Sequence, residues 1–505
     1  MVFVPISNCF WGSSATAIID QVLVLALWLL CSDVSGFFKI WSRKHREPVK
    51  FIPKSRHNVQ TLWVTQKLDH FNPRDNRTWK MRYMSNDEHY KAGGPIIIQI
   101  GGEWTITSGV LLGGQHYDIA AQHKGYLFYT EHRYYGESHP TPDVSTKNLQ
   151  YLSVDQSLAD LAYFVDYVKG QITAKDSKVI VVGGSYAGSM AAWFRLKYPH
   201  QCDIALSSSA PLLAIADFYK YHEVVGKALK SESGDRCYQI VEEGMKQLRE
   251  VMKTANGPQE IAQLFNLCVA INPRDALDYG TLVSGIENVI AGIVQYHQPG
   301  DIENACDILQ KNTDATNGSE LKGLAALIKS NVGWESSECA EADYLSLVNA
   351  FKQVSWSSLN ATDGMHPWLY QTCTEYGYYQ TDSSPNQPYG SGINTLHFNI
   401  QICKDIFEDV FTDNAEDILN TGIERTNVVY GALTSAVDRV IFTHGTVDPW
   451  HSIGLLEEVN PKSPVIVVKG TSHCKDLESI SSADSAEMKA AKKRVLELIA
   501  KWLSE

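Results

Sequence analysis

The sequence predicts an α/β fold in which a parallel sheet is interrupted by a disulfide-stapled helical cap. Three observations predict this fold. Strand-like and helix-like segments alternate over residues 51–215, helical periodicity and cysteines dominate residues 216–420, and the alternation returns over residues 421–505. Alternating strands and helices are typical of a parallel sheet covered by helices. Because the sheet pattern begins early and finishes late, the first and third regions are expected to form one discontinuous domain.

Short runs of β-branched and aromatic residues that end in glycine or charged turns are predicted to form strands. They are residues 95–103, 125–136, 178–185, 439–445 and 464–470. Two segments, 153–172 and 485–505, instead repeat their apolar residues as amphipathic helices do. The resulting order places residues 178–190 at a junction between a strand and a helix.

An apolar run of ten residues, 22–31, indicates that residues 1–35 are a signal peptide. Such a run matches the apolar core of a signal and falls short of the roughly 20 residues that span a bilayer. Small residues follow the run, but no Lys or Arg precedes it, and the basic residues 43–46 come after it. A retained anchor and a misassigned start therefore stay open, and stable membrane insertion is expected only if the leader is retained.

Charge and cysteine usage narrow the class of protein. With 44 Lys and Arg against 57 Asp and Glu, the net charge is −13, and no basic stripe is available to bind nucleic acid. After the leader, eight dispersed cysteines without C-x-x-C pairs favour disulfides in an oxidising compartment over a zinc site. Sequons at Asn76, Asn317 and Asn360 agree with secretion. We therefore expect a secreted or endolysosomal protein, and the disulfide pairing stays open.

The junction at residues 178–190 reads KVIVVGGSYAGSM and carries the candidate nucleophile, Ser185. In a nucleophile elbow, small neighbours let a serine hydroxyl stand clear of a strained turn between a strand and a helix. The small neighbours here are Gly183, Ala187 and Gly188. The alternative is a glycine-rich turn that only packs tightly.

A serine nucleophile needs a base that takes its proton and a third group that orients the base. In this context the chain order is Ser, acid, His, and the last two follow late strands. Asp448 and His473 follow the two late predicted strands in that order. We assign Asp448 as the orienting carboxylate and His473 as the general base and acid. His444 and His451 are competitors that suit core or surface roles, and the proline after Asp448 also suits a structural turn.

Two backbone N–H groups are needed to stabilise the negative charge that develops on the attacked carbonyl oxygen. Tyr186, directly after the nucleophile, is the candidate for one. Gly102 or Glu103, in the loop after an early strand, is the candidate for the other, with an ordinary turn as the alternative. The sequence has no H-E-x-x-H motif, no paired-cysteine zinc spacing and no dinucleotide-binding glycine motif, so no metal and no cofactor are expected.

Five separated motifs carry a family resemblance. They are EHRYYGES, GGSYAGSMAAWFRLKYPH, WLYQTCTEYGYY, VDPWH and TSHCKDL. In matching order they resemble the prolyl carboxypeptidase family of serine peptidases, which includes a lysosomal dipeptidyl peptidase, and they look most like its thymus-specific branch. The resemblance covers about residues 60–503. It implies an α/β-hydrolase fold with an inserted helical cap, exopeptidase cleavage in secretory or endolysosomal compartments, and the roles already assigned to Ser185, Asp448 and His473.

The resemblance also bears on the substrate pocket. It suggests Trp450 as a pocket wall, and it places Ser189 beside the pocket, where prolyl-specific members have methionine. That difference weakens the expectation of a strict proline preference. Glu103 and Glu375 are candidate amine binders, with a structural role as the alternative for each. Cleavage from the carboxyl end and removal of an N-terminal dipeptide both stay open.

The predicted function is a serine exopeptidase that hydrolyses peptides through an acyl-enzyme, with proline-containing sites as one option. A carboxylesterase or lipase with the same triad is the nearest alternative. A catalytically silent α/β-hydrolase that binds partners is the other, and the presence of all three candidate triad residues argues against it. Peptides are the expected partners. The natural substrate and the oligomeric state, including a homodimer, stay open.

Overall fold

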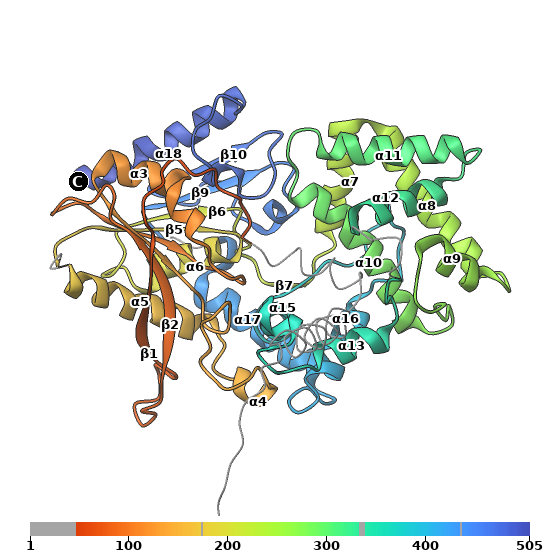
Figure 1. Ribbon diagram of the computed structural model, residues 1–505, viewed down its shortest axis with the longest axis horizontal. Coiled ribbons are helices and arrows are strands. Elements are labelled where there is room, and N and C mark those ends of the chain that lie inside the picture. Colours follow the sequence, from red (N-terminus) through yellow and green to blue (C-terminus); the bar gives the residue numbers. More distant parts are fainter. Residues whose placement is uncertain (1–46, 173–174, 333–338, 435–436) are drawn as a thin grey trace, which may run out of the picture.

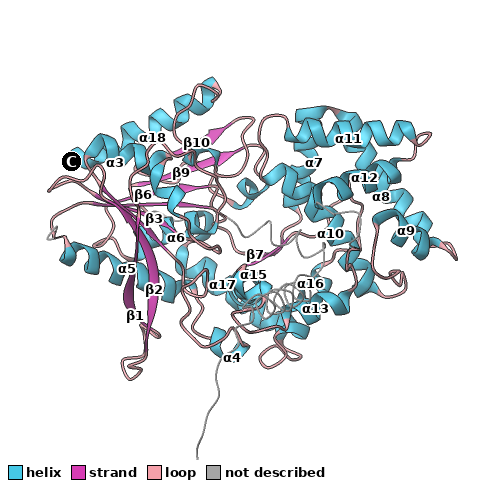
Figure 2. Cartoon of the chain, in the orientation of Figure 1, coloured by secondary structure: helices cyan, strands magenta, loops and turns pink. Residues whose placement is uncertain are grey.

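A sheet-based half and a helical half lie side by side in this fold (Figure 1). The computed structural model describes residues 47–172, 175–332, 339–434 and 437–505. The predicted signal peptide, residues 1–35, lies outside the described residues. The large sheet occupies one half, and helices make up nearly all of the other (Figure 2).

The large sheet has eight strands in the order β1-β2-β4-β3-β5-β6-β9-β10. They are β1 (Gln60–Lys67), β2 (Thr78–Asn86), β3 (Ile96–Ile100), β4 (Tyr126–Thr130), β5 (Val179–Gly184), β6 (Ile204–Ser208), β9 (Val440–Gly445) and β10 (Val465–Val468). β2 pairs antiparallel with β1 and β4, and the other neighbouring pairs are parallel. The five predicted strands are confirmed as β3, β4, β5, β9 and β10. Because β6 pairs with β9, segments from before and after the helical region form one sheet.

Helices cover both faces of this sheet. α5 (Val154–Gln171) and α6 (Tyr186–Lys197) pack on one face, and α3 (Gln115–His123) and α18 (Ala486–Ser504) pack on the other. In β3, Ile97 packs with α3 and α18, whereas its neighbours on both sides pack with α5 and α6. Burial on both faces explains why the parallel strands are mostly apolar rather than alternating. α5 and α18 are the two helices that periodicity predicts.

The helices between β6 and β9 form a cap beside the sheet (Figure 1). They are α7 (Lys220–Ser233), α8 (Asp235–Met252), α9 (Gly257–Phe265), α10 (Ala276–Gln295), α11 (Asp301–Ala315), α12 (Glu320–Val332), α13 (Tyr344–Phe351), α14 (Leu359–Thr362), α15 (Met365–Gln371), α16 (Leu396–Ile406) and α17 (Ala415–Tyr430). The predicted end of the insertion, residue 420, falls inside α17. The helical region therefore continues to Tyr430.

Short elements complete the chain. They are η1 (Ser108–Leu112), α4 (Thr146–Leu149), β7 (Ile215–Asp217), the π-helical turn η2 (Thr372–Tyr376), β8 (Gly377–Tyr379), η3 (Ala432–Thr434), η4 (Pro449–Ile453) and η5 (Lys475–Leu477). β7 and β8 pair in parallel as a two-stranded sheet. This pairing links the segment that leaves β6 to the segment that leaves η2.

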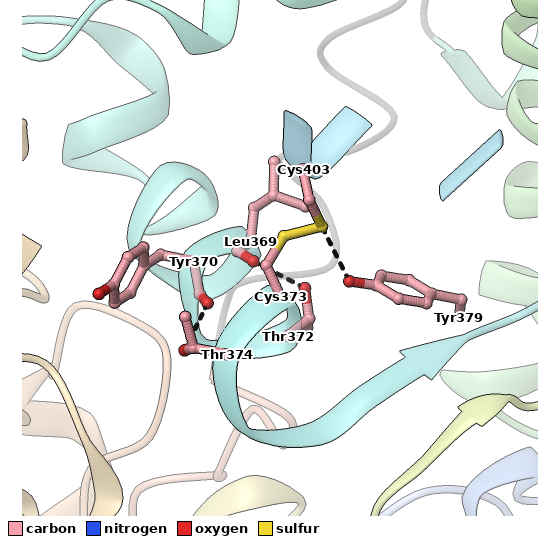
Figure 3. Close-up of a disulfide and its surroundings, with 7 residues drawn as sticks. All are labelled: Leu369, Tyr370, Thr372, Cys373, Thr374, Tyr379 and Cys403. Carbon is pink, nitrogen blue, oxygen red and sulfur yellow. Dashed lines mark hydrogen bonds between the residues drawn. A yellow bond between two sulfur atoms is a disulfide. The ribbon is translucent and has the colours of Figure 1, made fainter. Parts of the chain in front are cut away.

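Disulfides staple the cap, as predicted. The pairs are Cys237 with Cys306, Cys268 with Cys339, and Cys373 with Cys403. Figure 3 shows Cys373 of η2 joined to Cys403 of α16, with the Tyr379 hydroxyl 3.1 Å from Cys403 Sγ. The expectation that all eight cysteines after the leader form disulfides is wrong for Cys202 and Cys474, which are free and buried. Both side chains pack within the apolar clusters of the sheet half.

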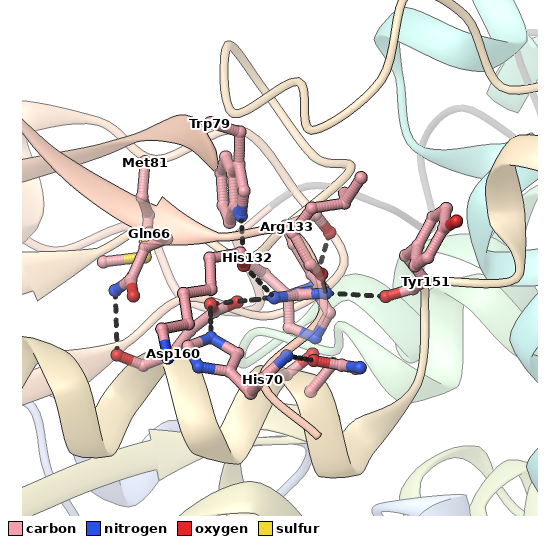
Figure 4. Close-up of polar contacts among 12 residues, drawn as sticks. Gln66, His70, Trp79, Met81, His132, Arg133, Tyr151 and Asp160 are labelled. Atoms are coloured by element: carbon pink, nitrogen blue, oxygen red, sulfur yellow. Dashed lines mark hydrogen bonds and ion pairs between the residues drawn. The ribbon is translucent and has the colours of Figure 1, made fainter. Parts of the chain in front are cut away.

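A buried ionic cluster ties the loop after β4 to α5 (Figure 4). The Arg133 guanidinium donates two hydrogen bonds to the Asp160 carboxylate, at 2.6 and 2.8 Å. His70 Nε2 lies 2.7 Å from the same carboxylate. Burial raises the pKa of Asp160, but the charge of Arg133 outweighs it and holds that pKa below its ordinary value. In the same loop, His132 Nε2 lies 3.1 Å from the Tyr186 hydroxyl, so the loop reaches the start of α6.

The surface bears on two expectations, glycosylation and membrane insertion. Asn76 and Asn317 are exposed, as glycan acceptors must be. Asn360 is only 7% exposed, which contradicts the expectation of a glycan there, because a bulky glycan needs a side chain that projects into solvent. In the part of the chain that the structure describes, no helix combines the length and the apolar character needed to cross a bilayer.

Candidate active site

Ser185 lies in a tight turn between β5 and α6. Its backbone has φ 60° and ψ −134°, a conformation that residues other than glycine rarely adopt. The turn needs small neighbours, because a Cβ at Gly183 would lie 2.0 Å from the Ala187 carbonyl oxygen. A Cβ at Gly188 would likewise lie 2.6 Å from the Ser208 carbonyl oxygen. A strained serine with small neighbours, held between a strand and a helix, has the geometry of a nucleophile elbow.

Asp448 and His473 come together at one edge of the sheet. They follow β9 and β10, which are parallel neighbours, so both loops leave the sheet at the same edge. His473 Nδ1 lies 2.9 Å from Asp448 Oδ1, and both side chains are buried. Since an ionised carboxylate only accepts hydrogen bonds, Nδ1 carries a proton, and in the neutral imidazole Nε2 then keeps its lone pair. That Nε2 is buried and has no hydrogen-bond partner among the described residues.

Burial and charge act in opposite directions on this pair. Burial lowers the pKa of His473, but the Asp448 carboxylate outweighs it and raises that pKa well above its ordinary value. For Asp448, burial raises the pKa, while His473 and the Trp450 N–H, 3.0 Å away, lower it below the ordinary value. The pair therefore favours an imidazolium beside a carboxylate, which is the charge state that forms when His473 takes a proton.

The turn that carries Ser185 packs against the loop that carries His473. A Cβ at Gly184 would lie 2.8 Å from Cys474 Sγ, so the two segments approach too closely for a larger residue. The Cys474 N–H also donates to the Ser209 hydroxyl at 2.9 Å, just beyond β6. The segments that carry the three predicted triad residues thus lie together at the sheet edge, and the catalytic roles of these residues stay predictions.

Neither competing histidine is hydrogen-bonded to the Asp448 carboxylate among the described contacts. His444 is buried in β9, where burial lowers its pKa to about 4. The His444 ring packs directly against Gly454, because a Cβ at that glycine would lie only 2.1 Å from the ring. His451 Nδ1 lies 2.6 Å from the backbone oxygen of Asp448 rather than from its carboxylate. The contacts of His444 and His451 therefore fit the structural roles that are the alternative for these histidines.

The two candidate oxyanion donors lie on adjacent segments. Tyr186 is the first residue of α6, where backbone N–H groups have no partner within the helix. Gly102 follows β3, the parallel neighbour of β5. A Cβ at Gly102 would lie 2.5 Å from the Trp104 ring, so a larger residue would disturb this loop. The oxyanion roles of Tyr186 and Gly102 stay predictions.

One cavity, open to solvent, joins the sheet edge to the cap. Glu103, Ser185, Tyr186 and Trp450 line it from the sheet side. The opposite walls come from the cap, mainly from α10, α13, α15, α16 and β8. Trp450 thus lines the cavity that holds Ser185, which fits its predicted position at the substrate pocket.

Ser189 does not line this cavity. It is fully buried in α6, and its hydroxyl donates to the Pro211 carbonyl oxygen at 2.9 Å. Pro211 itself lines the cavity. The prediction that Ser189 is a pocket residue is therefore wrong, because the side chain is buried in the core and supports the cavity wall from behind.

Gln295, at the end of α10, joins the cap to the candidate site, and it does not stand out in the sequence. Its Oε1 accepts hydrogen bonds from Trp450 Nε1 at 3.0 Å and from the Tyr221 hydroxyl at 2.6 Å. Its backbone oxygen accepts from the Ser472 hydroxyl at 2.7 Å and from the His473 N–H at 3.3 Å. The sequence signal is weak, because a polar residue at the end of an apolar helix is common.

Glu375 has a structural role. Its two carboxylate oxygens accept from the Val154 N–H at the start of α5, at 3.1 and 3.3 Å. Among the described residues, the cavity lining does not include Glu375. Of the two candidate amine binders, only Glu103 lies where a substrate in this cavity could reach it.

The sheet order, the elbow after β5 and the inserted cap define an α/β-hydrolase. Residues 66–495 match the family described as Serine carboxypeptidase S28, and the chain belongs to that family. It is therefore a serine-type peptidase, and the family that the motifs predict is confirmed.

Relatives cover the sheet and the cap together. The chain is 28% identical over 458 residues to the thymus-specific serine protease of Mus musculus, covering 88% of this chain and 87% of that one. It is 26% identical over 475 residues to the lysosomal Pro-X carboxypeptidase of Bos taurus, with 88% of each covered. Among solved structures, it resembles the proline iminopeptidase of Mycobacterium smegmatis with a TM-score of 0.32 and 10% identity, over 87% of this chain and 98% of that one.

Proposed function

We propose that the chain is an exopeptidase in which Ser185, His473 and Asp448 act as nucleophile, base and orienting acid. The observation that carries this proposal is the 2.9 Å contact between His473 Nδ1 and Asp448 Oδ1, which leaves Nε2 as the free base beside the elbow of Ser185. Membership of a serine peptidase family supports it.

In the proposed reaction, His473 Nε2 takes the Ser185 proton as Oγ attacks the carbonyl carbon of the scissile bond. The N–H groups of Tyr186 and Gly102 stabilise the resulting oxyanion. The imidazolium then gives its proton to the leaving nitrogen, the C–N bond breaks, and an acyl-enzyme remains. Water attacks this ester in the same way, with His473 as its base, and releases the acid and free Ser185.

The cavity supports cleavage near a chain end, with proline as one accepted residue. Flat aromatic rings suit a pyrrolidine ring, and the rings of Trp450 and Tyr378 meet edge to face with centroids 5.5 Å apart. Pro211 also lines this region. The name of the bovine relative, a Pro-X carboxypeptidase, agrees with this preference. A cavity walled by both sheet and cap favours flexible peptide ends over folded proteins.

The proposed location is the secretory pathway, either outside the cell or in endosomes and lysosomes. The three cap disulfides support an oxidising compartment. One relative carries the word lysosomal in its name. Secretion of the full chain from cultured cells, followed by mapping of its first residue, would test both the location and the cleavage of the leader.

Labelling with a fluorophosphonate probe tests the proposed nucleophile. Wild type is expected to be labelled between pH 4.5 and 8, whereas Ser185→Ala should not be labelled and should lose about 10⁴-fold or more in kcat. Ser482→Ala, at an exposed serine, is the matched control. Absence of labelling in the folded wild type would contradict the proposal. Turnover of acyl esters without any peptide turnover would instead favour an esterase.

A further inference from the structure

Glu103 is a buried carboxyl group inside the candidate active site. It follows β3, which runs parallel to β5 with Gln99 opposite Val182, so the segments that carry Glu103 and Ser185 leave the sheet side by side. Both residues line the same cavity. Glu103 is only 7% exposed, and its Oε2 has no hydrogen-bond partner among the described residues. An unpartnered oxygen of this kind is costly, and a bound ligand that donates a hydrogen bond would satisfy it.

The charge of the cavity indicates which end of a peptide it accepts. No Lys or Arg is among the described residues that line it, and Glu103 is the acidic residue in its walls. The carboxylate of a substrate's C-terminus would therefore meet no Lys or Arg there and would be repelled by an ionised Glu103. An α-ammonium group would instead gain a charge-assisted hydrogen bond.

The protonation of Glu103 depends on the group bound beside it. Burial raises its pKa to about 7, although a hydrogen bond to its own backbone and the nearby His473 lower it. The hydroxyl groups of Tyr135 and Tyr186 also lie in its electrostatic surroundings. A substrate ammonium beside the carboxyl group would favour the ionised form, because an opposite charge lowers the pKa of an acid.

We infer that the Glu103 carboxylate binds the α-ammonium group of a free peptide N-terminus, so that the chain removes residues from the amino end of its substrates. The inference rests on the proposed function of Ser185, His473 and Asp448. It adds the substrate class, which is peptides with an unblocked amino terminus, and it makes Glu103 a specificity-determining residue.

The test compares kcat/KM for matched peptides with a free or acetylated N-terminus, and with a free or amidated C-terminus. For wild type, acetylation is expected to lower kcat/KM about 30-fold or more, and amidation to change it less than about 3-fold. Glu103→Gln keeps the size of the side chain and removes its charge. It should reduce the preference for the free N-terminus to within about 3-fold. Glu416→Gln removes an exposed charge and is the matched control.

The ratio of kcat/KM for the free and acetylated peptides, measured on the same variant, separates a loss of amine recognition from a loss of folding or a disturbed oxyanion loop. If Glu103→Gln lowers kcat/KM equally for free and acetylated peptides, Glu103 does not bind the ammonium and the inference is wrong. It is also overturned if amidation of the C-terminus abolishes cleavage by wild type while acetylation does not, since that marks a carboxypeptidase. Both results leave the nucleophile assignment intact, because that depends on labelling of Ser185.

Discussion

Ser185 lies in a strained turn, and its proposed base, His473, is already oriented by Asp448. The positive φ at Ser185 and the close approach of Gly183 to Ala187 fix the turn that presents the hydroxyl. His473 is held by Asp448 in the tautomer that leaves Nε2 free. In the proposed mechanism, attack by Ser185 therefore depends on the hydrogen bond between His473 and Asp448. That bond can be removed by a substitution outside the turn that carries Ser185.

Asp448→Asn is expected to lower kcat by about 10⁴-fold while the chain stays folded, because an amide no longer fixes the tautomer of His473. It should also lower the pKa of His473, since the Asp448 carboxylate is the first of the interactions that raise it, ahead of Cys474. The proposed base must be neutral, so kcat/KM of wild type rises with pH through the raised pKa of His473. A pH–rate profile checks both points. A variant that keeps most of the wild-type kcat would contradict the assignment.

The residues of the proposed triad could be singled out from the sequence because each follows an apolar strand in the expected order. The position of the Ser189 side chain could not be predicted, because closeness to the elbow in sequence does not say which way the helix points that side chain. In the structure, its hydroxyl donates to the Pro211 carbonyl oxygen. The unpartnered oxygen of Glu103 and the contacts of Gln295 depend on packing between distant segments. Those features become visible only in the fold.

At the scale of elements, the buried parallel strands were predictable and the edge hairpin was not. β3 and β5 are buried throughout because helices cover both their faces, and apart from Gln99 they carry only apolar side chains and glycine. β1 and β2 pair over their full length, but charged residues such as Lys67 and Lys80 interrupt their apolar pattern. β6, with its sequence IALSS, is short and ends in serines. Its burial comes from neighbours on both sides rather than from its own sequence.

The disulfide between Cys373 and Cys403 holds the π-helical turn η2 against α16, and both elements contribute cavity walls. Replacing both cysteines with serine is expected to cost about 2–5 kcal/mol of stability. It should also raise KM, because Thr372 and Ile402 line the cavity next to the bond. Thermal unfolding and peptide kinetics measure the two effects.

The pair formed by Cys237 and Cys306 provides the matched control. It joins α8 to α11, and neither cysteine lines the cavity within the described residues. Replacing both with serine should lower stability by a similar amount and leave KM nearly unchanged. Equal changes in KM for the two double variants would show that η2 has no special influence on the cavity.

At the scale of the whole molecule, the cap and the sheet meet directly at the proposed catalytic loop. The end of α10 accepts hydrogen bonds from Ser472 and His473, and Gln295 also holds Trp450 and Tyr221. The cap is therefore part of the site rather than a lid placed over it. A shift of α10 would therefore move the proposed base, His473, and the pocket wall, Trp450, together.

Gln295→Leu is expected to lower kcat/KM about 10-fold or more, because it leaves the buried donors of Trp450 and Tyr221 unpaired, at about 1–3 kcal/mol each. Gln295→Glu keeps an oxygen acceptor at the same place and should retain most of the activity. Separate values of kcat and KM for the two variants provide the measurement. If both variants behave alike, the acceptor atom is not what positions Trp450.

The discontinuous sheet also sets when activity can arise during synthesis. The strand that delivers Ser185 leaves the ribosome early, whereas β9 and β10 follow the entire cap. A nascent chain thus has the proposed nucleophile but neither Asp448 nor His473, and β9 cannot pair with β6 until the cap has been made. If the proposed triad is correct, an unfinished chain lacks both the base and its orienting acid, and the peptidase becomes able to attack neighbouring polypeptides only after its own translation is complete.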